Sequence, residues 1–352
     1  MIGLLVAASL TGFEPADLRP LDRFIDGADV VALGEGRHTS EGFYQAKFQL
    51  IKYLVEVKGF RVVAFENPWL RSRKTADYVD GGRATEQEAL AGLFGVWRSE
   101  TVRDLLSWLR RYNQEHPADS VRFIGFDMQQ PAEDVEQLRA AIPEAALCPV
   151  DAAAPRQAYE RCLKVLGAAQ VERPGDKLSA LSLAAWQRMT LLDRYEKGEE
   201  TFQSWEVRDQ AMAQLFLALR PPKAKTIIWA ANAHIAVTKM GVAVVAGKAV
   251  RPNVKRMGTF LAAKLGRRYA PIGLISYDVK TSWPSIRNQD RPKQNALETR
   301  LLREGHVFAL VDTGTLEKGA IVEGYPFAIY DLRKDFRALI YLDNSPPGRM
   351  LP

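Results

Sequence analysis

A glutamate and a histidine three residues apart give this sequence a candidate for general-base catalysis. Glu35 and His38 lie in the segment Gly34-Glu35-Gly36-Arg37-His38, directly after an apolar run. The carboxylate can orient the imidazole and raise its basicity, which is how a catalytic base is built. The glycines allow a tight turn with room for a substrate. A turn in which Glu35 caps the next helix is the structural alternative, and we favour catalysis.

A second candidate carboxylate follows the next apolar run. Glu66 comes directly after Val62-Val63-Ala64-Phe65. A carboxylate at the end of a buried strand is costly unless it is paired, and Arg37 or His38 could supply the partner. A structural salt bridge to a neighbouring helix explains Glu66 equally well.

Two of the four histidines follow predicted strands. His234 lies in Asn232-Ala233-His234, shortly after the apolar run 226–230, just as His38 follows the run 30–33. A single histidine of this kind is usually a core residue, but two at matching strand ends favour one shared site. Asn232 and His234 are therefore candidates for that site.

Three further charged residues are candidates for substrate contacts. Asp127 ends an apolar run, although a turn carboxylate that caps the next element is the preferred explanation. Arg208 and Asp209 fall on the apolar stripe of a helix predicted over 201–219, so they need partners or face a cleft. An ion pair within the fold explains them as well as a role in the site does.

Strands and helices alternate along the first part of the chain. Short apolar runs predict strands, amphipathic stretches predict helices, and strand patterns return in the last third. The predicted strands cover 30–33, 62–65, 121–126, 226–230, 272–277, 307–311 and 338–342, and the predicted helices include 41–58 and 101–113. This order predicts an α/β fold with a central, largely parallel (mixed) sheet flanked by helices. Neighbouring parallel strands end at the same edge, so Glu35, His38, Glu66 and His234 should converge on one cleft.

The middle of the chain has almost no strand pattern. We expect residues 131–219 to form a helical insertion lidding the cleft, with Arg208 and Asp209 facing inward, and residues 1–130 and 220–352 to form the α/β core. Residues 281–292 resemble a long loop. The apolar segment 1–13 is too short to span a bilayer, and we expect it to pack on the core rather than to be a signal remnant.

Composition narrows the function classes. The chain has 352 residues and a formal charge of +6, and residues 221–300 hold 15 Lys and Arg against three acids. Such a surface could attract an anion or RNA, but no aromatic-interleaved RNA motif accompanies it, so we expect no nucleic-acid partner. Cys148 and Cys162 match no metal spacing and suggest a reducing compartment. With no run long enough for a membrane span, we expect a soluble, cytoplasmic protein.

Several common catalytic signatures are missing. The sequence has no G-x-S-x-G elbow, no H-E-x-x-H and no paired C-x-x-C. The segment from Gly241 to Lys248 has the wrong spacing for a P-loop, and Thr39 replaces the third glycine of a dinucleotide fingerprint. We therefore expect neither a cofactor nor a metal.

Taken together, the motifs resemble the erythromycin esterase-like family, in order from about Asp22 to Leu342. The matching pieces are Leu33-Gly34-Glu35 with His38, Phe65-Glu66, Gly125-Phe126-Asp127-Met128-Gln129, Arg208-Asp209, Asn232-Ala233-His234 and Met257-Gly258. The resemblance implies a hydrolase that is metal-independent or optionally metal-dependent. It implies that His38 acts as general base on water, that Glu35 and Glu66 are the family's acids, and that His234 is the second cleft histidine. Lys47 corresponds to a position where family esterases can have Arg.

The sequence departs from the family pattern beside both histidines. Ala231 stands where family esterases commonly have a further His, and Arg37 precedes His38. We expect an esterase-like hydrolase of an ester or lactone other than erythromycin. Its substrate would be a small molecule, anionic or peptidic in character, bound by Arg37, Lys47, Asp127, Arg208, Asp209 and Asn232. The alternatives are a dehydratase or cyclase acting on an intermediate of natural-product biosynthesis, and a non-catalytic binding protein.

Overall fold

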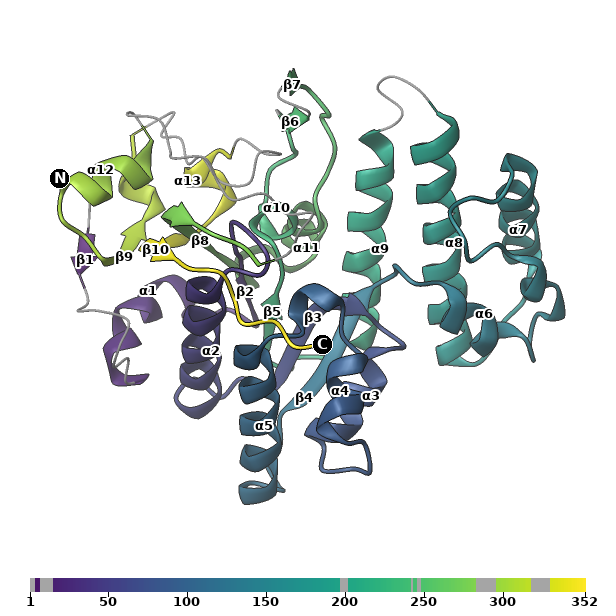
Figure 1. Ribbon diagram of the computed structural model, residues 1–352, viewed down its shortest axis with the longest axis horizontal. Helices are drawn as coiled ribbons and strands as arrows, with labels where there is room; N and C mark the ends of the chain where they lie inside the picture. Colours follow the sequence, from purple (N-terminus) through teal and green to yellow (C-terminus); the bar gives the residue numbers. More distant parts are fainter. Residues whose placement is uncertain are drawn as a thin grey trace.

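The strands of this protein assemble into one central sheet. The computed structural model describes residues 4–6, 15–196, 202–241, 243–245, 248–282, 296–317 and 330–352. The sheet has eight strands in the order β1-β9-β10-β8-β2-β5-β3-β4 (Figure 1). They are β1 (Leu4–Val6), β2 (Val30–Leu33), β3 (Val62–Pro68), β4 (Arg122–Asp127), β5 (Thr226–Trp229), β8 (Tyr269–Val279), β9 (Phe308–Asp312) and β10 (Ala338–Ser345). A separate ribbon pairs β6 (Ala243–Val245) with β7 (Lys248–Val250).

Most neighbouring strands run parallel. β10, β8, β2, β5, β3 and β4 form the parallel part, and β9 and β1 continue it in antiparallel pairings. All four residues of β2 are fully buried, as expected for a strand covered on both faces. The predicted α/β fold with a largely parallel, mixed sheet is confirmed.

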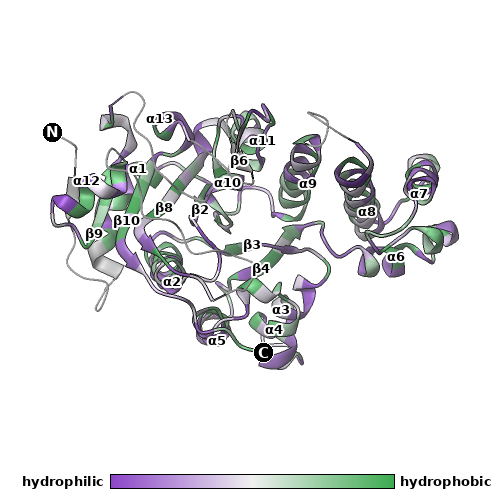
Figure 2. Ribbon diagram, turned by 45° about the horizontal axis from the view of Figure 1, so that its top comes forward, coloured by the Kyte–Doolittle hydropathy of each residue, from purple (hydrophilic) through white to green (hydrophobic). Residues whose placement is uncertain are grey.

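Helices cover both faces of this sheet. The α-helices among the described residues are α1 (Asp22–Ile25), α2 (Glu41–Glu56), α3 (Ser72–Val79), α4 (Glu86–Ala91), α5 (Glu100–Glu115), α6 (Ala132–Leu138), α7 (Arg156–Ala168), α8 (Pro174–Tyr195), α9 (Gln203–Leu219), α10 (Asn232–Ile235), α11 (Met257–Leu265), α12 (Leu297–Arg303) and α13 (Leu332–Asp335). Figure 2 shows hydrophobic residues concentrated along the strands that these helices cover.

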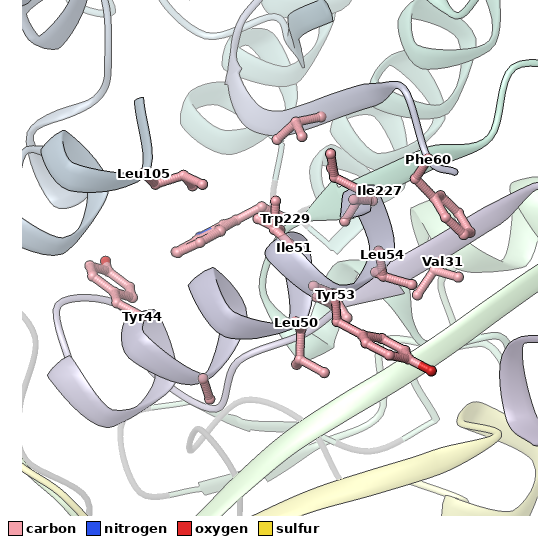
Figure 3. Close-up of a cluster of buried hydrophobic side chains, with 14 of the residues drawn as sticks. Val31, Tyr44, Leu50, Ile51, Tyr53, Leu54, Phe60, Leu105, Ile227 and Trp229 are labelled. Atoms are coloured by element: carbon pink, nitrogen blue, oxygen red, sulfur yellow. The ribbon is translucent and has the colours of Figure 1, made fainter. Parts of the chain in front are cut away.

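The alternating side chains of each strand divide between two apolar layers. Val31 packs with Leu50 and Leu54 of α2, whereas Val30 and Ala32 belong to the layer under α9 and α11. Figure 3 shows the first layer, in which α2 lies over Val31 and Trp229 of the sheet. Two-sided packing of this kind fixes the position of each strand end, where the candidate catalytic residues lie.

A long helical excursion connects β4 to β5. α9 packs against β4 and α11, so it covers the sheet, while α8 packs on α9 and α7 on α8, extending away from the sheet (Figure 1). Helices account for most of the described part of residues 131–219. The division of the chain into domains and the role of these helices as a lid stay predictions.

The two cysteines contradict the predicted reducing compartment. Cys148 and Cys162 form a disulfide within a small apolar cluster that includes Leu138 and Leu183. Their Cα atoms are 5.0 Å apart because α7 folds back beside the turn that carries Cys148, and sequence spacing does not reveal this. The interpretation of both as reduced thiols was therefore wrong, and it had supported the cytoplasmic location.

The remaining sequence expectations are only partly covered by the described residues. Leu4–Val6 of the apolar N-terminal segment forms β1 and pairs with β9, while the predicted loop 281–292 lies mostly outside the described residues. Within the part of the chain that the structure describes, no helix is both long and apolar enough to cross a membrane.

A close backbone contact sets the position of α11 and predicts an effect on stability. A Cβ atom at Gly258 would lie 2.2 Å from the carbonyl oxygen of Ile235 and 2.5 Å from that of Ala236. Gly258→Ala should lower the free energy of unfolding by about 1–3 kcal/mol, because the backbone must shift. Gly167→Ala in α7 is the matched control, with nothing within 4 Å; it should be neutral or raise stability by up to about 1 kcal/mol. Urea unfolding measures both, and equal stabilities would contradict the contact.

Candidate active site

The ends of β2, β3 and β5 open into one cavity of about 560 Å³. The strand-end residues that line it are Glu35, Arg37, His38, Glu66 and His234, and α9 adds Arg208 and Asp209. The structure thus brings seven of the predicted site residues together at the carboxyl edge of the sheet. This is the edge at which open α/β sheets bind their ligands.

Glu35 connects two basic side chains. Its Oε1 lies 2.5 Å from Nδ1 of His38, and its Oε2 accepts a hydrogen bond of 2.7 Å from Nζ of Lys47. Glu35 and Lys47 are fully buried, whereas the His38 side chain is 23% exposed, toward the cavity. Because Glu35 engages Nδ1, Nε2 is the ring nitrogen of His38 that remains for a proton transfer.

The loop that carries His38 adopts a constrained backbone. Thr39 has a φ angle of 60°, in the left-handed region, which costs a residue with a Cβ on the order of 1–3 kcal/mol. Its N–H donates to the hydroxyl of Tyr44 (2.8 Å), and its carbonyl accepts from the N–H of Gly348 (2.9 Å). Trp97 packs edge-on against the His38 ring at 4.8 Å. Contacts from both α2 and the C-terminal segment therefore hold the loop that carries His38.

Glu66 and Asp127 share one arginine. Nη2 of Arg208 donates to Oε1 of Glu66 (2.9 Å) and to Oδ2 of Asp127 (2.6 Å). The other oxygen of Glu66 accepts from the backbone N–H of Ala231 (2.9 Å). Asp127 also accepts from the backbone N–H groups of the two residues that follow it. Arg208 thereby ties α9 to the ends of β3 and β4.

His234 lies between two carboxylates. Its Nδ1 is 2.8 Å from Oδ1 of Asp209, and its Nε2 is 3.3 Å from Oε1 of Glu66. Oδ1 of Asp209 also accepts from the N–H of Met257 (2.7 Å), at the start of α11. Nη1 of Arg208 also lies 3.3 Å from Nε2. The two flanking carboxylates favour the protonated form of the ring.

The pKa values of His234 and Glu66 depend on burial and on the neighbouring charges. Burial lowers the pKa of His234, but Asp209 and Glu66 outweigh it and raise the pKa to about 10. Burial raises the pKa of Glu66, but His234 and Arg208 hold it well below the usual value of a glutamate. The cavity therefore contains two fixed cationic donors, Arg208 and His234, beside the candidate base.

Three predicted substrate contacts do not line the cavity. Lys47 lies behind Glu35, where its Nζ also donates to the carbonyl of Ala230 (3.1 Å). The amide of Asn232 binds both backbone groups of Leu274, and Asp127 binds Arg208. These positions suit residues that hold the site together more than residues that touch a substrate.

Sequence reasoning missed the apolar wall of the cavity. Its members come from loops and helices far apart in the chain, and no spacing connects them. They are Phe94, Trp97, Met189, Trp205, Met240 and Tyr330, with Asp193 as an additional acid. Among the residues that the structure describes, no group of three or more His, Cys, Asp or Glu side chains could hold a metal ion.

Comparison with known proteins identifies the family of this chain. The family model described as erythromycin esterase matches residues 55–320. This chain belongs to the erythromycin esterase family. Over 112 residues, 32% of the chain, it is 29% identical to the erythromycin esterase type II of Escherichia coli, and the match spans only 26% of that relative.

Two solved structures share the fold over nearly the whole chain. A crystal structure of a Bacillus cereus protein superposes with a TM-score of 0.80 at 20% identity, covering 99% of this chain and 97% of that one. A mutant of the erythromycin esterase EreC in its open conformation gives a TM-score of 0.75 at 17% identity, covering 99% of both chains. With sequence identities of 20% and 17%, these similarities show a shared fold and no more.

The raised pKa of His234 predicts how stability depends on pH. The folded state holds this proton up to about pH 10, and an ordinary histidine releases it near 6.5. The contribution is therefore complete below about pH 6.5 and disappears as the pH rises through 10. Urea unfolding from pH 6 to 10 should show a steeper fall for the unmodified protein than for His234→Gln.

His116→Gln is the matched control, since His116 is exposed at the end of α5. This variant should keep the slope of the unmodified protein. Equal slopes for the unmodified protein and His234→Gln would contradict a protonated His234.

Proposed function

We propose that this chain is a hydrolase that cleaves a carboxylic ester, a lactone or a related bond with water activated by His38. The observation that carries the proposal is the hydrogen bond of 2.5 Å between Glu35 and Nδ1 of His38 at the wall of the cavity. It leaves Nε2 to accept a proton from water, and the ionised Glu35 stabilises the imidazolium that results. Membership of the erythromycin esterase family supports the same reaction class.

The reaction would proceed in two steps. Water attacks the carbonyl carbon as Nε2 of His38 takes its proton, which gives a tetrahedral intermediate with a negatively charged oxygen. The carbon–oxygen bond to the alcohol then breaks, and His38 returns the proton to the departing oxygen. Arg208 and the protonated His234 line the same cavity and are the donors suited to the oxyanion. Each such donor typically lowers the barrier by about 3 kcal/mol.

Lys47 would act through Glu35 in this scheme. Its ammonium group is fully buried, 2.7 Å from Oε2 of Glu35, and it also lies over the ring of Trp229. Burial lowers the pKa of Lys47, while Glu35 opposes that effect. A cation in this position compensates the charge of Glu35, whose other carboxylate oxygen lies against Nδ1 of His38.

A second candidate reaction uses the same residues without water as a reactant. His38 could remove a proton from the substrate while a group on the His234 side assists the loss of a hydroxyl, which gives dehydration or cyclisation. The cavity-lining Ala231 in place of a family histidine and the nearby Arg37 favour this alternative. Mass spectrometry of products distinguishes the two reactions, because hydrolysis adds the mass of water and dehydration removes it.

Replacing His38 should strongly reduce turnover. We expect His38→Ala to reduce ester or lactone hydrolysis by a hundred- to ten-thousandfold, the usual contribution of a general base. Activity is measured over a panel of esters and lactones, and circular dichroism checks the fold. His116→Ala, at the exposed end of α5, should retain full activity. Full activity in His38→Ala would end the proposal, and no turnover by the unmodified protein on any panel member would favour the alternatives.

Erythromycin itself should be a poor substrate. Ala231 lines the cavity but can neither donate a hydrogen bond nor transfer a proton, so one electrophilic partner of the family site is missing. Ring opening should be about a hundredfold slower than with a complete set of donors. Chromatography of the opened lactone measures the rate, and Ala231→His should increase it. Rapid ring opening by the unmodified protein would show that Ala231 is not limiting.

A further inference from the structure

A second cavity, of about 540 Å³, lies away from the candidate active site. Its lining includes Tyr269, the first residue of β8, and Arg337, directly before β10, so it sits beside the amino ends of these parallel strands. Glu35 and Glu66 lie at or beyond the carboxyl ends of β2 and β3. The two cavities share no lining residue.

Basic side chains dominate this second lining. They come from α1, from the turn that follows α11, from α13 and from the start of β10, and they are Arg23, Arg267, Arg333, Lys334 and Arg337. Among the residues that the structure describes, Asp312 is the one acid in the lining. Arg267 belongs to the basic stretch 221–300 and does not line the candidate active site. Segments far apart in the sequence therefore converge to give one basic cavity.

Two of the five cations have carboxylate partners. Arg23 lies 3.3 Å from Asp312, and Lys334 lies 2.8 Å from Asp331. In the described parts of the chain, no carboxylate lies within ion-pair distance of Arg267, Arg333 or Arg337. Three positive charges in one cavity thus have no ion-pair partner among the described residues.

The position of Arg337 brings like charges together. Its guanidinium donates to the carbonyl of Phe24 (3.0 Å) and to the carbonyl of Arg267, so backbone oxygens hold it in place without neutralising it. Arg337 is half-buried. Burial and the nearby Arg267 both lower its pKa. Like charges held close together cost free energy, and an anion between them would remove that cost.

We propose that this cavity binds a small anion that carries two or more phosphate groups. Guanidinium groups present planar forks of N–H donors that match phosphate oxygens. Three cations without acidic partners suit a ligand with a charge of −2 or more, and a cavity of about 540 Å³ is in the usual size range for small-molecule sites. The proposal is independent of the hydrolytic function, because no residue is shared.

Calorimetric titration of the unmodified chain with inorganic pyrophosphate and tripolyphosphate tests the proposal. We expect saturable binding of one anion per chain. A double variant, Arg267→Gln with Arg333→Gln, should bind at least tenfold more weakly, and both side chains are exposed, so the fold should tolerate the change. The matched control is Arg103→Gln with Arg349→Gln, which removes the same charge from elsewhere on the surface; it should bind like the unmodified protein.

Three outcomes would overturn the proposal. One is the absence of saturable binding of either probe at millimolar concentration, and another is an equal loss of affinity in both double variants, which indicates unspecific attraction. The third is a single-stranded RNA that binds more tightly than tripolyphosphate and loses its affinity in the Arg267 and Arg333 variant, since the surface would then serve a nucleic acid. Ester hydrolysis by each variant is measured in parallel and should be unchanged.

Discussion

The buried negative charges at the carboxyl edge of the sheet must be matched by cations, and this requirement determines how the neighbouring helices pack. Four carboxylates, those of Glu35, Glu66, Asp127 and Asp209, are almost completely removed from water. An isolated buried carboxylate is costly, so each must meet a cation or several N–H donors. Lys47, Arg208 and His234 are those cations. α2 and α9 therefore have to pack where they do, because they carry Lys47 and Arg208 to the strand ends.

The two cleft histidines show how such a balance assigns chemical roles. Glu35 divides its charge between Lys47 and His38, whereas His234 receives two carboxylates. The two carboxylates around His234 hold a proton on its ring, so this side chain is a donor. His38 has one carboxylate partner, and its other ring nitrogen lies beside the cavity for proton transfer. In the proposed mechanism, the number of carboxylates around each imidazole decides which ring serves as the base and which as a donor.

Sequence patterns predicted the parts of this site that depend on local order. Parallel strands end at one edge of a sheet, so the sequence alone predicts that Glu35, Glu66 and His234 lie in one cleft. The burial of Lys47 had a usable indication, because it lies on the same helical stripe as Phe43, Leu50 and Leu54. The Cys148–Cys162 bond and the aromatic wall had none, since they join elements whose approach is decided by packing over the whole molecule.

The excursion between β4 and β5 places the buried charges and part of the cavity wall on different helices. α9, against the sheet, bears the charges that the strand ends require, while α8, one layer further out, contributes Met189 and Asp193 to the cavity wall. Met189 is uncharged, and Asp193 forms no ion pair with His234 among the described contacts. Substitutions on the inner side of α8 can therefore alter the cavity wall and leave the ion pairs at the strand ends intact. Under the proposed function, this arrangement would let the preferred substrate differ among members of the family while the charged residues at the strand ends stay the same.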